Sequence, residues 1–216
     1  MSALKKLLRG LFCAVLIVVC ATVVAVVTYL LVFRPWQLRW GATDEELARA
    51  MPGDELVTEP DLDTTRGVTV DARPEEIWPW LVQIGYRRAG FYSYDRLDNA
   101  GVPSAERILP EFQDIKIGDK IPLDRVNRME VVVLEPPRVM VWNLPGRGLS
   151  WAWGLYPLDG RRTRLVTRLH WRYKWRWPVI LGYFMTDVGD FIMMRKCMLG
   201  IKRRAEAAGP EAGAEA

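Results

Sequence analysis

The sequence has few of the residues from which metal sites and catalytic triads are built. It contains 216 residues with three cysteines and one histidine, and neither CxxC nor HExxH occurs in it. A disulfide framework and a structural zinc site are therefore excluded. With no second histidine and no Gly-x-Ser-x-Gly sequence, a Ser-His-Asp hydrolase is excluded as well. We predict no metal site and no cofactor.

The folded part of the chain also lacks an excess of positive charge. Residues 1–40 carry five cations and no carboxylate, which leaves 25 basic against 26 acidic residues in 41–216. The net charge of +4 therefore comes from the first forty residues. A basic nucleic-acid-binding surface has no support, so we predict no nucleic-acid partner. Half of the residues are apolar and ten are tryptophan, which excludes an intrinsically disordered chain.

One long run without charge stands near the N-terminus. As a helix, the 24 residues Gly10 to Phe33 would extend about 36 Å, more than the hydrocarbon thickness of a bilayer. A cleaved signal peptide is the alternative, but the run is longer than its usual apolar segment and no small-x-small cleavage site follows. We predict a basic flank at 1–9, a transmembrane helix at 10–33 and a single-pass protein of the cell membrane. The cations on the two sides favour a cytoplasmic N-terminus only slightly, so the side of the soluble domain stays open.

The remaining residues indicate one α+β domain. We expect a juxtamembrane spacer at 34–63, in which Thr43 and Glu46 form the capping box of a short helix. Next we expect a strand at 66–72 and a helix at 74–84, followed by a meander of strands ending with 163–175. A long helix from Pro178 to about residue 207 closes the domain, and residues 208–216 are predicted to be disordered. The charges of this long helix argue against a second membrane span, so we expect the helix to cover the soluble domain with Asp187 facing inward.

The last predicted strand alternates strictly between two kinds of residue. Thr163, Leu165 and the following odd-numbered positions fall on one face, which we expect to line an interior. Arg164, Arg168 and His170 fall on the other face, which we expect to be exposed to water. For this cationic face, binding of anionic lipid head groups is the functional alternative. We expect His170 to be a surface residue and not a catalytic one.

Three strings in the sequence resemble those of one protein superfamily. They are DARPEEIWPWL at residues 71–81, GFYSYD at 90–95 and MLGIKRRAE at 198–206. Together with the order of elements, they resemble the SRPBCC superfamily, which includes Bet v 1-like, START-like and polyketide cyclase-like proteins. The resemblance covers residues 64–207. It implies a helix-grip fold, in which a curved antiparallel sheet surrounds a long C-terminal helix and an apolar cavity.

The candidate ligand-binding residues follow from this resemblance and from the polarity of the segments. The cluster at 92–95 either forms a polar patch at the cavity mouth or fastens its loop by hydrogen bonds. Asp187, an acid on an apolar helix face, either forms a salt bridge or has a raised pKa. The tryptophans are core residues or cavity walls. The predicted set is Trp78, Tyr92, Tyr94, Asp95, Trp153, Trp171, Phe184, Asp187 and Phe191.

Two functional hypotheses follow from the sequence. The first is a membrane-anchored domain that binds a hydrophobic small molecule or lipid in a helix-grip cavity. The second is a cyclase or dehydratase in which Tyr94, Asp95 and Asp187 position and protonate a polyketide-like substrate. No recognisable catalytic constellation supports the second hypothesis, and fold alone does not choose between the two. The sequence does not predict an oligomeric state.

Overall fold

The structure is a computed structural model that describes residues 3–172 and 180–208, without the side chains of Leu4 and residues 180–185. The chain divides into two compact units, Met1–Leu38 and Arg39–Ala216. The predicted tail at 208–216 lies outside the described residues from position 209 onward.

The first unit is one long apolar helix. It comprises α1 (Ala3–Thr28), a π-helical turn at Tyr29–Phe33 and α2 (Arg34–Leu38). Over Lys5–Leu38 it is 34 residues long with a mean hydropathy of 3.0, and within the described part of the chain it is the one helix suited to crossing a membrane. The predicted apolar helix is confirmed. The C-terminal helix, as far as the structure describes it, is not apolar enough to be a candidate membrane span, as expected from its charges.

The second unit is built on one antiparallel sheet. Its strands lie in the order β1-β6-β5-β4-β3-β2, so β2 to β6 form a meander and β1 pairs with the last strand. The strand bounds are Leu62–Val70 (β1), Lys120–Pro122 (β2), Arg128–Glu135 (β3), Val139–Leu144 (β4), Leu149–Pro157 (β5) and Thr163–Trp171 (β6). The predicted meander is confirmed, with its last strand ending at Trp171; residues 173–175 of the predicted strand lie outside the described residues.

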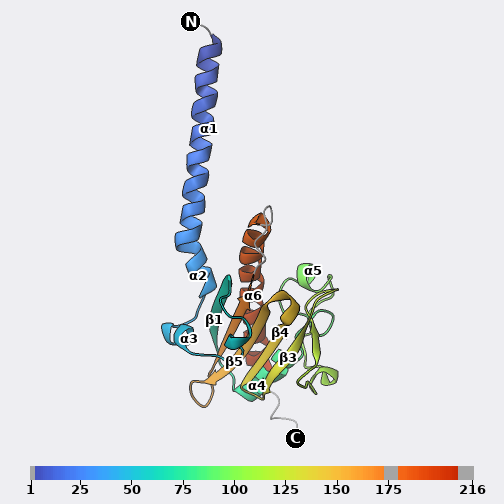
Figure 1. Cartoon of the computed structure of the whole chain (residues 1–216). Coiled ribbons are helices and arrows are strands. Elements are labelled where there is room, and N and C mark those ends of the chain that lie inside the picture. The colour runs from blue at the N-terminus through green and yellow to red at the C-terminus, as the bar shows by residue number, and fades with distance from the viewer. Residues whose placement is uncertain (1–2, 173–179, 209–216) are drawn as a thin grey trace. The chain divides into compact units, whose positions relative to one another are not determined.

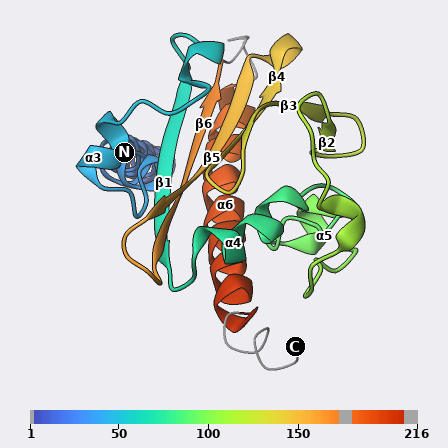
Figure 2. The same ribbon diagram turned by 90° about the horizontal axis from the view of Figure 1, so that it is seen from below.

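Two helices complete the helix-grip arrangement of this unit. The long helix α6 (Ile180–Ala208) lies along one face of the curved sheet, and α4 (Pro74–Val82) crosses it (Figures 1 and 2). Short helices occur at α3 (Asp44–Ala48) and α5 (Asp95–Asp98). The predicted capping box of α3 is present, because Thr43 and Glu46 each bond the backbone N–H of the other. The predicted fold class is therefore confirmed.

The face of the sheet that α6 covers, the inner face, holds a cluster of tryptophans. Trp142, Trp151 and Trp153 pack against one another with ring centroids 5.0–6.2 Å apart. The indole of Trp151 donates to Thr167 Oγ1 at 2.8 Å. These rings fill the inner face over β4 and β5. As predicted, the odd-numbered residues of β6 belong to this face.

The opposite face of the sheet, which we call the outer face, is covered by another segment of the chain. The prediction that this face is exposed to water is therefore wrong. Residues 41–57, which we call the strap, lie across it. Arg168 is only 6% exposed and donates to Asp54 Oδ2 at 2.7 Å and to the carbonyls of Glu46 and Arg49 at 2.9 and 3.0 Å. Sequence alternation shows which residues share a face but not what covers that face.

The two other basic residues named on this face, Arg164 and His170, are also paired within the domain. Arg164 donates two hydrogen bonds of 2.7 Å to the carboxylate of Glu46. His170 is 8% exposed, with its Nε2 3.2 Å from Asp63 Oδ1, so it is not the surface residue predicted. It does lie on the face away from α6, as expected. Since Arg164 and Arg168 are engaged by the strap, they are unavailable to lipid head groups.

The strap has an apolar contact with the sheet as well as polar ones. Met51 packs into a buried cluster with Val139, Val141, Ala152 and Val166. At its start the strap crosses β1 closely, because the N–H of Gly67 donates to the carbonyl of Trp40 at 3.2 Å. A Cβ on Gly41, whose φ is +70°, would lie 2.2 Å from the oxygen of Gly67. The residues predicted as a spacer therefore include a segment that is part of the folded domain.

The largely buried pair of Glu46 and Arg164, whose side chains are 8% and 15% exposed, gives a first prediction. Glu46→Gln should lower the free energy of unfolding by about 3 kcal/mol, because it leaves a largely buried guanidinium without its counter-charge. Glu45→Gln, at the exposed neighbouring position of the same helix, should change it by less than about 0.5 kcal/mol. Urea unfolding followed by tryptophan fluorescence measures both. Equal effects of the two variants would contradict the pairing.

The same pair predicts a pH dependence. Burial raises the pKa of Glu46, but the bonds from Arg164 and the Thr43 N–H outweigh it and lower the pKa below its ordinary value of 4.5. A lowered pKa contributes stability at pH values above 4.5 that is lost as the pH falls through the folded-state pKa. The difference in unfolding free energy between wild type and Glu46→Gln should therefore shrink below pH 4.5. A difference that stays constant from pH 7 to pH 3 would refute this.

Candidate ligand-binding site

A small apolar chamber lies between the inner face of the sheet, the middle of α6 and the loop that leads into α5. Its volume is 170 Å³, similar to that of cavities of about 150 Å³ that hold a benzene molecule. Met194 and Cys197 of α6 and Trp151 of β5 form much of its wall. The full lining is Phe91, Ser93, Asp98, Leu123, Trp151, Asp190, Met193, Met194 and Cys197.

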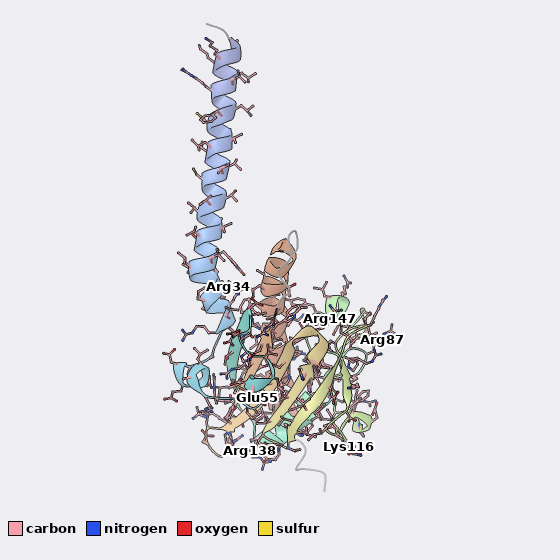
Figure 3. The ribbon with its side chains drawn as sticks, in the orientation of Figure 1. Arg34, Glu55, Arg87, Lys116, Arg138 and Arg147 are labelled. Atoms are coloured by element: carbon pink, nitrogen blue, oxygen red, sulfur yellow. The ribbon has the colours of Figure 1, made fainter. Side chains whose placement is uncertain are left out.

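Two larger hollows adjoin this chamber. The β6 hollow, of 610 Å³, lies toward Trp171 and Arg147 and shares Leu123, Asp190 and Met193 with the chamber. The α5 hollow, of 530 Å³, shares Leu123, Met193 and Asp98 with it. Arg147 and Arg87 lie at the end of the second unit that holds these hollows, and Arg138 and Lys116 lie at the opposite end (Figure 3). Leu123 and Met193 border all three spaces.

A buried salt bridge lies at the border between the chamber and the β6 hollow. Arg66 of β1 is 1% exposed, and its Nη1 donates to Asp190 Oδ2 of α6 at 2.7 Å. The same guanidinium lies over the ring of Phe191, 5.6 Å from its centroid. The pair joins α6 to the sheet, and the positive charge of Arg66 balances the negative charge of Asp190 at this border.

Asp98 is the second acid in the chamber, and it has no such counter-charge in the part of the chain that the structure describes. Its Oδ2 accepts a hydrogen bond from the N–H of Tyr94 at 3.3 Å. Its Oδ1 is buried and has no hydrogen-bond partner among the described residues. Burial raises the pKa of Asp98, and the nearby charge of Asp95 adds to this, so the hydrogen bonds it accepts only partly offset the rise. Such a carboxyl retains its proton to a higher pH than an exposed one.

The thiol of Cys197 is unreactive in this setting. It is 2% exposed, and burial raises its pKa far above the ordinary range, with the negative charge of Asp98 contributing. A thiol held in the protonated form is a weak nucleophile. Cys197 therefore serves as a wall of the chamber.

The predicted polar residues Tyr92, Tyr94 and Asp95 fasten their loop and do not line the chamber, whereas Ser93 between them does. Tyr92 is buried, and its hydroxyl donates to the carbonyl of Trp80 at 3.0 Å and accepts from Gln83 Nε2 at 2.8 Å. Asp95 accepts from the hydroxyl of Ser104 at 2.5 Å. Tyr94 is 39% exposed, with Lys196 Nζ 3.8 Å from its ring centroid. Of the two interpretations of this cluster, loop attachment is the one these contacts support.

The structure places the predicted aromatic residues in different surroundings. Trp171 lines the β6 hollow. Trp153 is fully buried within the tryptophan cluster, and Trp78 is half-buried on α4, outside the three hollows. Phe191 is half-buried beneath Arg66. The side chain of Phe184 lies outside the described residues.

Asp187 is buried on α6, as predicted, at 5% exposure. The sequence reasoning missed Asp190 and Cys197, which lie three and ten positions further along this helix and do line the chamber. Positions 187, 190, 194 and 197 share one helix face by their spacing of three and four, so that spacing could have found them. Asp98 had no such signal, because it lies in a loop with a four-residue helix.

Comparisons with known proteins find similarity among solved structures. No protein-family model and no curated protein matches the chain. Among solved structures, the chain is similar to the Polyketide_cyc-like protein Cgl2372 of Corynebacterium glutamicum, at 16% identity over 74% of this chain and 99% of that chain, with a TM-score of 0.47. It is also similar to the self-sacrificing resistance protein CalC of Micromonospora echinospora, at 8% identity over 69% and 97% of the two chains, with a TM-score of 0.43.

The first of these two proteins is described as polyketide cyclase-like, one of the groups in the superfamily that the sequence resembles. Because the identities are low and the TM-scores are below 0.5, the fold assignment rests on this chain's own strand order and long helix. No activity is carried over from these proteins.

The contact between α6 and the loop at Tyr92 gives a further prediction. A Cβ on Gly200 would lie 2.5 Å from the carbonyl oxygen of Tyr92, so Gly200→Ala should force the loop and helix apart and destabilise the fold by about 1–3 kcal/mol. Gly189→Ala, on the same helix with nothing within 4 Å of the new Cβ, should stabilise it by about 0.5–1 kcal/mol. Thermal unfolding of both variants measures the difference. Two variants that melt together would disprove the close approach.

Proposed function

We propose that the second unit binds a hydrophobic small molecule or lipid in the chamber and the adjoining hollows. The observation that carries this proposal is an apolar chamber of 170 Å³ that shares wall residues with larger hollows of 610 and 530 Å³. Concave, mostly apolar spaces with a few polar groups are typical of small-molecule sites. A ring or chain end would occupy the chamber, and the rest of the ligand would extend past Leu123 and Met193.

We further propose that the N-terminal helix anchors this domain to the cell membrane as a single span. The length and hydropathy of Lys5–Leu38 support this proposal, since a bilayer requires about twenty apolar residues. An apolar ligand is concentrated in lipid and scarce in water. A domain tethered at the membrane would therefore meet its ligand where the ligand is most abundant.

The cyclase or dehydratase hypothesis receives less support from the geometry. Tyr94 and Asp95, two of the residues assigned to it, are engaged by Lys196 and Ser104 and do not line the chamber. General acid catalysis requires the acid within hydrogen-bond reach of the reacting group. Binding is therefore the function that these contacts favour.

Native mass spectrometry of the full chain, released from detergent micelles, tests the binding proposal. The wild type should retain an apolar ligand from its host, or one from an added panel of fatty acids and aromatic polyketides. Leu123→Trp should reduce that retention by tenfold or so, because the larger ring fills the space that all three hollows share. Val126→Trp, at a 77% exposed position of the same loop, is the matched control and should bind as the wild type does. A wild type that takes up no ligand, or a Leu123→Trp variant that retains it fully, would refute the proposal.

A further inference from the structure

The chamber contains one polar atom that the protein leaves without a partner. Among the described residues, Oδ1 of Asp98 is buried and accepts no hydrogen bond. Its position is fixed, because the backbone N–H of Asp98 donates to the carbonyl of Tyr94 at 3.1 Å while Oδ2 accepts from the N–H of Tyr94 at 3.3 Å. A buried acceptor without a donor carries a free-energy cost that a ligand can relieve.

The other polar groups of the chamber are already engaged. Asp190 is paired with Arg66 at 2.7 Å. The hydroxyl of Ser93 has a single proton and two acceptors near it, the Met193 carbonyl at 3.0 Å and the carboxyl of Asp98, and it cannot satisfy both. The remaining walls, including Phe91, Leu123 and Met194, are apolar. Asp98 is therefore the group with capacity left for a ligand.

We propose that Asp98 is the polar anchor of this site, and that the chamber takes a ring-sized apolar group bearing a hydroxyl, which donates its proton to Asp98 Oδ1. This inference rests on the proposed binding function and names its ligand class. The ring size follows from the chamber volume of 170 Å³, since a cavity of about 150 Å³ accommodates benzene. A hydroxyl is favoured over an ammonium group, because the apolar walls would strip a full charge of its water.

A hydroxyl also suits Asp98 in both of its protonation states. It donates to the carboxylate, and it can accept from the carboxylic acid. An ether or ketone has no proton to donate and would place its oxygen against an ionised carboxylate. The site should therefore distinguish a phenol from its methyl ether, although the two have nearly the same ring and apolar surface.

The experiment compares 2-naphthol with 2-methoxynaphthalene at pH 8, using the full chain in lipid nanodiscs. Both compounds accept energy from tryptophan, and Trp151 lines the chamber, so quenching of tryptophan fluorescence reports binding. The wild type should bind naphthol about tenfold or more tightly than the ether, as expected for one hydrogen bond to a charged group. Asp98→Leu should remove this preference while keeping ether binding, which also shows that the chamber is still folded. Asp114→Leu, at an 83% exposed side chain, should behave as the wild type.

The possible failures are distinguishable. Equal binding of the two compounds by the wild type, or an unchanged preference in Asp98→Leu, would overturn the role of Asp98 and leave the binding function intact. Binding of neither compound above the level of empty nanodiscs would count against the proposed function itself. The preference for naphthol over the ether is compared between wild type and Asp98→Leu in the same kind of nanodisc. Partition of the two compounds into the lipid is equal for both proteins and therefore cancels.

Discussion

The buried guanidinium of Arg168 is the interaction on which the arrangement of the second unit depends. Its donors reach Asp54 and Thr65 Oγ1, at 2.7 and 2.8 Å, and backbone carbonyls of the strap. A buried charge that lost these partners would cost several kcal/mol, so the strap and β6 are stable only together. With the outer face closed in this way, the inner face of the sheet is left for α6 and the chamber.

The inner face is filled unevenly, and this decides where the chamber lies. The tryptophan cluster occupies the part over β4 and β5, while α6 is held to β1 by the pair of Arg66 and Asp190. Between these two contacts the side chains of Met193, Met194 and Cys197 do not fill the space completely. Unbranched Met side chains adapt to irregular spaces. The methionine part of the chamber wall can therefore change its shape more readily than the tryptophan part can.

Much of the fold could be predicted from the sequence because its signals are local. The alternation of residues 163–171 identified β6 and its two faces, and Thr43 with Glu46 identified the start of α3. The strap could not be predicted, because its contacts with Arg164 and Arg168 join residues more than one hundred positions apart. The candidate site was harder to predict for a different reason, because the polarity of a residue does not show which groups its side chain contacts. Tyr92 and Asp95 have the polarity expected of a site, but their partners Trp80, Gln83 and Ser104 are fixed only by the folded loop.

The close crossing of Gly41 and Gly67 has a mechanical consequence. The chain enters the second unit with the carbonyl of Trp40 bonded to the N–H of Gly67, which is an interior residue of β1. Tension on the chain before Trp40 therefore reaches β1 within its length and not at a free end. Nine residue pairs join β1 to β6, and a load applied inside such a ladder is shared among several hydrogen bonds, whereas a load at the end opens them one at a time. The strap thus gives the domain a point of attachment at which pulling does not begin by peeling the sheet.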